Sequence, residues 1–431
     1  MFGCQQVLIK PDKELQAILE FICGESNKLH NCAVYYARQM YFKAHQFVRP
    51  FDLNSELKRN PHYGALCAQA AQQVCGAVGE AMKAFKGSLK LFREGGLDFR
   101  PKPPNYRDKG GLHLIAYPKQ ALGKKLIDDH IVVPLGQNVQ AWFGLKNFTI
   151  PMASNLDYAD IRELRILPRN GCFYAEFVYK VDVVDVVLNP DKALGIDPGL
   201  NNWLTCVSNV GTGFIVDGRQ LKSVNNWYNK QISTLKEGKP QGFWSQKLAE
   251  ITEKRNRQMR DAVNKAARLV VNHCLEHGIG TVVFGWNKGQ RQEINLGAKT
   301  NQKFVQIPTA RLKKRVEQLC EQYGIRFVET EESYTSKASF VDKDELPTFG
   351  AKPEGWQSSG KRTKRGIFRT ALNQYINADC NGAANILRKV ATTLGIELSE
   401  VSMGALTRPI RIRFWMPVQR KSGEARVHPA S

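Results

Sequence analysis

The sequence predicts a multidomain α+β protein. Its 431 residues are too many for one small hydrophobic core, so we expect two to four domains. Helical periodicity dominates the N-terminal part, short strand-like runs follow, and strands then alternate with helices. The chain carries 62 Lys and Arg against 40 Asp and Glu, and this net charge of +22 favours binding to polyanions, above all nucleic acid.

The N-terminal part opens with a short apolar run, QQVLIK, and then becomes helical. Leucine and isoleucine recur at spacings of three and four from Leu15 onward, which predicts two long helices at about 12–47 and 64–93, separated by a break around RPFDLN. One face of the second helix carries three glutamines, Gln69, Gln72 and Gln73. Glutamine can pair with adenine in a groove, although a solvated polar stripe explains the same pattern.

The middle of the chain predicts a small β domain. The segment FRPKPPNYRDKGG is rich in proline and cations, cannot be a helix interior and is interpreted as a linker. Short strand-like runs separated by turn residues follow it: LHLIAYP, HIVVPLG, FTIPM, IRELRILP and CFYAEFVYKV. Strands of this kind in series predict a barrel or a sandwich, and VVDVVLNP is then a strand or a connector.

The C-terminal half predicts a mixed sheet covered by helices. LGIDPG, LTCVS and GFIVDG are three strands with tight turns, followed by a charged helical region at about 225–277. The strand TVVFG, a helix at about 309–323, the strand IRFVET and the final helix NADCNGAANILRKV come next. This is the element order of the ribonuclease H fold. The tail TRPIRIRFWMP could clamp RNA or form a last strand.

Two aspartates stand where a lone acid is unusual. Phosphodiester hydrolysis by two Mg²⁺ ions needs about three carboxylates from separate elements. Asp197 ends an apolar strand just before Pro198-Gly199, where it could also be a turn residue. Asp379 lies near the start of the final helix, where it could be an ordinary cap, but the small residues after it would let that helix approach the sheet.

The motifs together resemble the TnpB family of transposon-encoded nucleases, relatives of type V CRISPR effectors. GIDPGLNN, YTSKASF and NADCNGAANI resemble its RuvC nuclease domain, and NKLHNCAVYYARQMYF, PPNYRDKGG and IAYPKQ extend the resemblance over nearly the whole chain. The resemblance implies an RNA-guided DNA endonuclease that uses two Mg²⁺ ions, with Mn²⁺ as a possible substitute. It also implies a guide RNA and target double-stranded DNA as partners, and a monomer on its RNA.

The resemblance also implies a domain plan. A helical recognition domain is inserted in an oligonucleotide-binding-like β-barrel, the wedge domain, and a ribonuclease H-like RuvC domain follows. On this chain the plan predicts a wedge at 1–10 and 106–190, a helical domain at 11–105, a nuclease domain at 191–395 and a basic C-terminal tail at 396–431.

Two departures from the family concern the site. The family places a glutamate at the end of the second motif's strand, where this chain has Phe284 and Gly285. The family also has paired cysteines after its TSK motif, but the insertion at 338–376 contains no cysteine, so we expect no zinc there.

The missing glutamate has two explanations. The nuclease is inactive, or the acid has moved to the neighbouring strand IRFVET, which is followed by Glu331 and Glu332. A spacing of three residues before the Thr of TSK, as in Fanzor relatives, selects Glu332, while Glu331 and Glu293 are alternatives. We favour relocation because Asp197 and Asp379 stand in full motifs, which makes Asp197, Glu332 and Asp379 the expected catalytic and metal-binding residues. An inactive RNA-guided DNA-binding protein and an unguided resolvase are the rival functions.

Basic residues near the final acid are expected to guide a nucleic-acid strand, although a solvated charge run explains them too. They are Lys361, Arg362, Lys364, Arg365 and Arg369 of KRTKRGIFR, together with Lys337 of YTSK.

His273 to His277 fit an H-x-x-E-H zinc pattern that we reject because it closes a helix before Gly278. The ten cysteines form no CxxC pair, and no run of about 18 apolar residues exists, so we expect a cytoplasmic protein without a membrane span.

Overall fold

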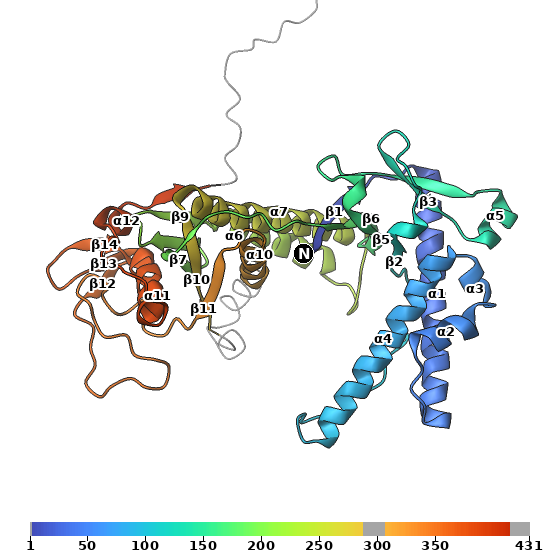
Figure 1. Cartoon of the computed structure of the whole chain (residues 1–431), viewed down its shortest axis with the longest axis horizontal. Coiled ribbons are helices and arrows are strands. Elements are labelled where there is room, and N and C mark those ends of the chain that lie inside the picture. The colour runs from blue at the N-terminus through green and yellow to red at the C-terminus, as the bar shows by residue number, and fades with distance from the viewer. Residues whose placement is uncertain (1, 288–306, 414–431) are drawn as a thin grey trace, which may run out of the picture. The chain divides into compact units, whose positions relative to one another are not determined.

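The computed structural model describes residues 2–287 and 307–413 (Figure 1). The chain divides into two compact units, Met1–Asp182 and Val183–Ser431, and both contain helices and strands, as expected for an α+β protein. Among the described residues, no helix has the length and apolar character that a membrane crossing requires.

The first unit begins with strand β1 (Phe2–Ile9), which is followed by four helices: α1 (Lys13–Ala44), α2 (Pro50–Leu57), α3 (Pro61–Gly64) and α4 (Ala68–Arg93). The side chain of Asp12 caps α1 by accepting the N–H of Leu15 at 2.8 Å. The two long helices, α1 and α4, are separate as predicted, but most of RPFDLN is itself helical, because Pro50 starts α2 at the first helical position, where a missing N–H costs nothing. Helix α4 packs closely on α2, since a Cβ on Gly79 would lie 2.7 Å from the Pro50 ring.

The predicted linker contains no helix or strand, as expected, but it is fixed along α1. The side chain of Asn27 donates to the carbonyl of Asp108 at 2.9 Å, and Arg38 donates to the carbonyl of Pro104 at 2.9 Å. Asn31 accepts the N–H of Arg107 at 2.8 Å. The segment is therefore part of the packed unit.

The strand-like runs of the middle region all form strands. An antiparallel sheet has the order β1-β6-β5-β2, with β2 (Ile115–Pro118), β5 (Ile161–Arg169) and β6 (Cys172–Lys180). A separate two-stranded sheet pairs β3 (His130–Pro134) with β4 (Asn147–Pro151), and α5 (Gln137–Phe143) lies between these strands in sequence. One hydrophobic core joins the helices and both sheets. The wedge barrel stays a prediction.

The second unit contains a six-stranded mixed sheet of order β11-β10-β7-β8-β9-β15. The first three strands pair antiparallel: β7 (Asn189–Pro198), β8 (Asn202–Ser208) and β9 (Gly213–Asp217). Strands β10 (Ile279–Gly285) and β11 (Arg326–Thr330) add parallel to β7, which confirms the expected neighbourhood of TVVFG and IRFVET.

Helices cover both faces of this sheet. One core joins Leu194 and Ile196 of β7 to α7 (Gln246–His277) and α10 (Thr309–Gln322). The other face carries α11 (Ala378–Leu394), which approaches so closely that a Cβ on Gly195 would lie 2.5 Å from the carbonyl oxygen of Ala383. Helix α6 (Arg219–Lys236) precedes α7. The small residues predicted to allow close packing of the last helix do allow it.

Two further parts complete the second unit. A small antiparallel sheet contains β12 (Lys361–Lys364), β13 (Ile367–Arg369) and β14 (Tyr375–Asn377), so the basic run KRTKRGIFR is a β-hairpin rather than a loop. Helix α12 (Met403–Thr407) and strand β15 (Ile410–Ile412) follow α11. Since β15 pairs parallel with β9, the sheet continues beyond residue 395, where the nuclease domain was predicted to end.

Candidate active site

Asp197 lies at the end of the central strand of the second unit. Residues Ala193 to Ile196 are buried on β7, and the strand pairs with β8 and β10 on its two sides. The chain then turns at Gly199, whose N–H donates to the carbonyl of Trp203 at 3.1 Å. Strand β7 therefore places the Asp197 carboxylate at the end of the sheet where the parallel strands β10 and β11 also end.

Asp379 lies in the first turn of α11 but does not cap the helix. The side chain of Asn377 is the cap, and it accepts the N–H groups of Asp379 and Cys380 at 3.0 and 3.1 Å. The Asp379 carboxylate is thereby left for other partners. Its Oδ2 accepts from Asn202 Nδ2 at 2.6 Å and its Oδ1 from Arg362 Nη2 at 2.8 Å.

The same helix comes within contact distance of Asp197. A Cβ added to Gly382, in the turn after Asp379, would lie 2.7 Å from Asp197 Oδ2. A side chain at residue 382 would collide with the carboxylate, so the glycine permits this close approach. Gly195 and Gly382 together set how closely the last helix and the central strand approach.

Glu332 follows β11 and occupies the space beside the end of β10. A Cβ added to Gly285 would lie 2.9 Å from both Cγ and Oε1 of Glu332. Asn287 fixes the backbone of this residue, because its Oδ1 accepts the Glu332 N–H at 2.8 Å. The structure thus places Glu332 beside Gly285, at the end of β10.

The three carboxylates influence one another electrostatically. Burial raises the pKa of Asp197 well above its usual range, and the negative charges of Glu332 and then Asp379 raise it further. The guanidinium of Arg362 acts in the opposite direction. An acid surrounded in this way binds cations or a proton strongly.

Glu331, one alternative to Glu332, has structural partners of its own. Glu331 forms an ion pair with Lys389 of α11 and accepts the N–H of Ser333 at 2.9 Å. Burial raises the pKa of Glu331, but the hydrogen bonds with Lys389 and Ser333 together lower it by more, so the pKa lies below its ordinary value. Glu331 therefore forms a structural ion pair. Glu293 lies outside the described residues.

Four asparagines support the site, and the sequence analysis missed all of them. Asn202 holds Asp379 and Asn287 holds Glu332. Asn381 and Asn385, on the buried face of α11, donate to carbonyls of the segment 335–338 that follows Glu332, at distances of 2.7 to 2.9 Å. A repeat of asparagine at i and i+4 on a helix that also carries small apolar residues was the available signal.

Carboxylates tie together the insertion at 338–376, which contains no cysteine. Asp344 accepts the N–H groups of Ser339 and Ser359 at 2.7 and 3.1 Å. Asp342 accepts the N–H of Ala371 at 2.9 Å. Hydrogen bonds thus connect three separate stretches of this insertion.

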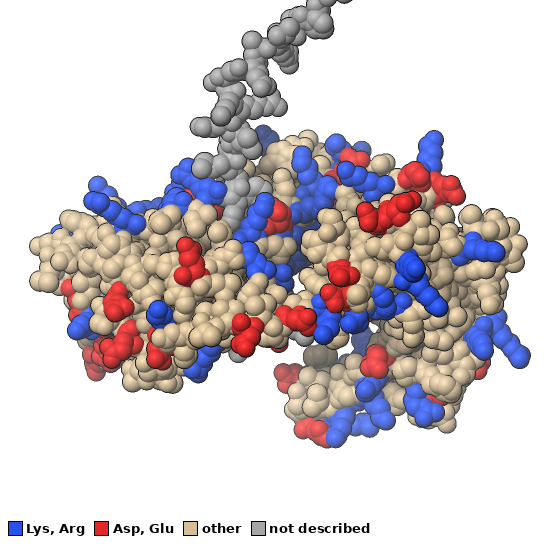
Figure 2. All heavy atoms as spheres, turned by 45° about the horizontal axis from the view of Figure 1, so that its top comes forward, with Lys and Arg blue, Asp and Glu red and all other residues tan. Residues whose placement is uncertain are grey.

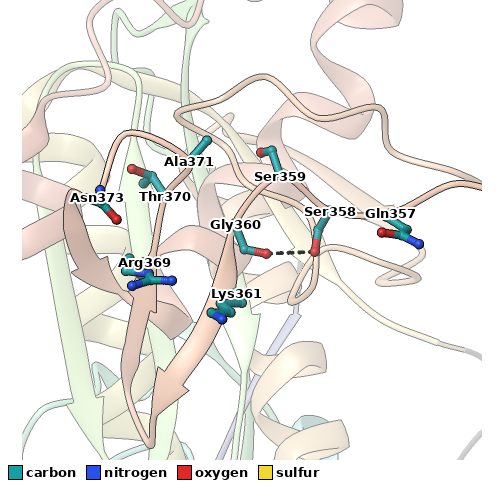
Figure 3. A pocket seen from close by; sticks show the side chains of 9 residues that line it. All are labelled: Gln357, Ser358, Ser359, Gly360, Lys361, Arg369, Thr370, Ala371 and Asn373. Atoms are coloured by element: carbon teal, nitrogen blue, oxygen red, sulfur yellow. Dashed lines mark hydrogen bonds between the residues drawn. The ribbon is translucent and has the colours of Figure 1, made fainter.

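The basic hairpin lies beside the acids through Arg362 alone. Lys361 is the direct cross-strand partner of Arg369, and the two side chains line an open pocket of about 530 Å³ with polar neighbours from 357–360 and 370–373 (Figure 3). Lys364 and Arg365 are exposed at the hairpin turn, and Lys337 is exposed in the turn after Glu332. Like charges placed opposite each other destabilise a sheet, so an anion bound at this pocket would reduce the repulsion between Lys361 and Arg369.

The glutamines belong to the first unit, and the histidine motif closes α7 of the second unit. On α4, Gln72 and Gln73 are exposed, whereas Gln69 accepts a hydrogen bond from the Cys67 thiol at 3.1 Å. His273 is hydrogen-bonded to Thr212 at 2.8 Å, and burial, aided by His277, lowers its pKa to about 4.

The histidine motif stands at the end of α7. Helix α7 ends at Gly278, as expected. Within residues 2–287 and 307–413, no three His, Cys, Asp or Glu side chains stand together as a ready metal-binding group. The Arg362 guanidinium instead takes one oxygen of Asp379. On the face drawn in Figure 2, Lys and Arg side chains are scattered among other residues rather than gathered in one patch.

One protein family matches part of the chain. Residues 176–291 match OrfB_IS605, described as a probable transposase, and this range includes Asp197 and all of β10. No curated protein matches the chain.

Several solved structures are similar at low identity. A Cas12f1–sgRNA–target DNA complex is 15% identical, with a TM-score of 0.34 over 90% of this chain and 98% of that chain. The mini-RNA-guided endonuclease CRISPR-Cas_phi3 is 11% identical, with a TM-score of 0.42 over 93% of each chain. CasPhi-2 (Cas12j) bound to crRNA is 10% identical, with a TM-score of 0.39 over 94% of this chain and 99% of that chain. These TM-scores are too low to establish a common overall fold.

Proposed function

We propose that this chain is an RNA-guided, Mg²⁺-dependent DNA endonuclease of the TnpB family, and the transposase match over residues 176–291 supports this proposal. Asp197, Glu332 and Asp379 are its proposed catalytic carboxylates. The observation that carries the proposal is their origin in three separate elements, with the side chain of Glu332 beside Gly285 and its charge acting on Asp197.

The donor set suits magnesium. Carboxylate oxygens are the hard ligands that Mg²⁺ prefers, and Mg²⁺ keeps several waters, so three acids suffice. Glycine at residues 382 and 285 lets the oxygens of Asp197 and Glu332 lie close to α11 and to the end of β10. When bound by these acids, the ions supply charge stabilisation at phosphorus and a more acidic water. Mn²⁺ has the same ligand preferences.

Residues around the acids orient the substrate and the ligands. Asn202 and Asn287 hold Asp379 and Glu332 in place. Arg362 can leave Asp379 for a phosphate oxygen, since a guanidinium pairs with either anion. Lys361 and Arg369 contact the phosphate backbone of the bound nucleic-acid strand. Lys337, Lys364 and Arg365 contact it at the periphery. By resemblance, the products carry a 5′-phosphate and a 3′-hydroxyl.

The partners follow from the charge and from the family. A net charge of +22 favours an RNA-bound protein, and the guide selects the target by base pairing. The helical and β parts of the first unit are proposed to read a short motif beside the target, with Gln69, Gln72 and Gln73 as contacts. A monomer on its RNA, acting in the cytoplasm at the nucleoid, completes the proposal.

A cleavage assay tests the function. The chain is purified with RNA from its own locus and mixed with matched duplex DNA, with and without Mg²⁺. We expect cleavage by the wild type only when RNA and Mg²⁺ are both present, and none by Asp197→Ala. Cleavage without RNA would remove the guided part of the proposal, and cleavage by Asp197→Ala would remove the proposed centre.

A nuclease-inactive, RNA-guided DNA-binding protein is the second candidate. It is favoured by the ion pair between Arg362 and Asp379, which occupies an oxygen that a metal would need. The same assay separates the two functions when DNA binding is measured beside cleavage. RNA-dependent binding without any cleavage by the wild type would establish the second candidate.

A further inference from the structure

The C-terminal strand lies directly against the nuclease sheet. Strand β15 pairs parallel with β9, with Arg411 opposite Ile215. The Arg411 guanidinium reaches the start of β8, where Asn202 pairs with Asp217 at the end of β9. There its Nη1 donates to Asn202 Oδ1 at 2.8 Å.

This contact decides which way the Asn202 amide faces. A guanidinium has only donors, so the partner of Arg411 must be the amide oxygen. The amide nitrogen is then turned to the other side, where it donates to Asp379 Oδ2 at 2.6 Å. With the amide reversed, its NH₂ group would face the guanidinium and its oxygen would face a carboxylate, and both contacts would be repulsive.

Asp217 fixes the guanidinium. Its carboxylate is buried, with 6% of the residue exposed, and its Oδ2 accepts from Arg411 Nη1 at 3.1 Å. Its Oδ1 accepts the N–H of Arg219, which ties the same side chain to the start of α6. A buried carboxylate of this kind is stable only with a cationic partner, so Arg411 and Asp217 hold each other.

We propose that Arg411 is a positioning residue of the nuclease centre, acting through Asn202 on Asp379. The inference rests on the proposed function, because Asp379 is a metal ligand there. Residues that hydrogen-bond a metal ligand orient it, and their loss typically reduces metal affinity or activity by about 10–100-fold. The C-terminal strand is therefore part of the catalytic apparatus and more than a basic tail.

The test measures metal binding directly as well as cleavage. Mn²⁺ binding to the RNA-bound protein is followed by electron paramagnetic resonance for wild type, Arg411→Ala, Arg411→Lys and Asn202→Ala. Arg413→Ala is the matched control, because Arg413 Nε lies 3.9 Å from the same Asp217 oxygen without contacting Asn202. Thermal unfolding of each variant identifies loss of folding.

We expect Arg411→Ala to weaken Mn²⁺ binding and cleavage by about 10-fold or more, with RNA-guided DNA binding unchanged and Arg413→Ala close to wild type. Arg411→Lys keeps a donor and should recover part of the loss. The double variant Arg411→Ala/Asn202→Ala should lose little more than Asn202→Ala alone, because both act on one contact.

Two results would overturn the inference. Equal Mn²⁺ affinity and cleavage in wild type and a folded Arg411→Ala would show that Asp379 needs no such support. Fully additive losses in the double variant would show that Arg411 acts by another route. A wild type that neither binds Mn²⁺ nor cleaves would instead refute the proposed nuclease itself.

Discussion

Gly285 and Glu332 stand at the ends of two neighbouring parallel strands, and each residue restricts the other. Any side chain at residue 285 would begin 2.9 Å from the Glu332 carboxylate, closer than a real Cβ approaches another atom. A glutamate on β10 and Glu332 in its present place therefore exclude each other. This exclusion gives a physical reason for a glycine to accompany an acid that has moved to the next strand.

The raised pKa of Asp197 predicts how the free energy of unfolding depends on pH in the absence of metal. Its pKa is raised in the folded chain, so the folded state binds a proton more readily than the unfolded state does. The free energy of unfolding therefore decreases as the pH rises from the ordinary Asp range, about 4, toward the raised pKa. At neutral pH the raised pKa of Asp197 lowers the stability of the metal-free protein.

Removing the titratable carboxyl group of Asp197 should stabilise the metal-free fold. We expect Asp197→Asn to raise the Tm at neutral pH by about 2–4 °C for each kcal/mol relieved and to flatten its dependence on pH. Asp191→Asn, an exposed change on the same strand, is the control. A lower Tm for Asp197→Asn at neutral pH, measured by calorimetry without metal, would contradict the electrostatic account.

At the scale of elements, the approach of α11 to β7 is the critical packing contact. A Cβ at Gly195 would meet the backbone oxygen of Ala383 at 2.5 Å and Leu387 Cγ at 2.6 Å. Overpacking of this kind costs about 1–3 kcal/mol. We expect Gly195→Ala to lower the Tm and to reduce cleavage, because the helix that carries Asp379 must move away from Asp197.

The matched control for this change is a glycine with open space around it. Gly87 lies in α4, and a Cβ there would meet nothing within 4 Å. Since alanine restricts the unfolded chain more than glycine does, Gly87→Ala should stabilise by about 0.4–1 kcal/mol. A Tm for Gly195→Ala equal to or above that of wild type would mean that α11 and β7 are less tightly packed than described.

Most elements could be predicted from the sequence because their patterns are local. The strands around Asp197 and the long helices α1, α4 and α7 follow from alternation, periodicity and caps. The short helix at RPFDLN was missed, although its proline suits a first helical position. The tail strand β15 has three residues, and only its pairing with β9 distinguishes it from a loop.

The site was predictable in part. Asp197 and Asp379 stand in recognisable motifs, and a spacing argument selected Glu332 over Glu331. The distinction between these two glutamates depends on Lys389, which is distant in sequence and pairs with Glu331. Asn202, Arg411 and Asp217 meet only when the sheet is assembled, so no local pattern in the sequence brings them together.

At the scale of the whole molecule, the excess of basic residues predicts that RNA affinity depends strongly on salt concentration. A surface that neutralises many phosphates releases counterions, so the logarithm of affinity falls linearly with the logarithm of salt concentration. We expect affinity for the guide RNA to fall by about 10³-fold or more between 50 and 200 mM salt, measured by filter binding. A nearly flat response, with the Tm unchanged over that range, would contradict an electrostatic RNA interface.

The central claim is that the middle acid of the centre has moved to Glu332. RNA-guided cleavage of matched duplex DNA in Mg²⁺, compared between Glu332→Gln and Glu331→Gln, tests it most directly, since both variants keep size and remove one charge. The account predicts that Glu332→Gln abolishes cleavage while retaining RNA-guided DNA binding, and that Glu331→Gln cleaves within a few-fold of wild type, with a lower Tm from the lost Lys389 ion pair. Cleavage that survives Glu332→Gln would contradict it.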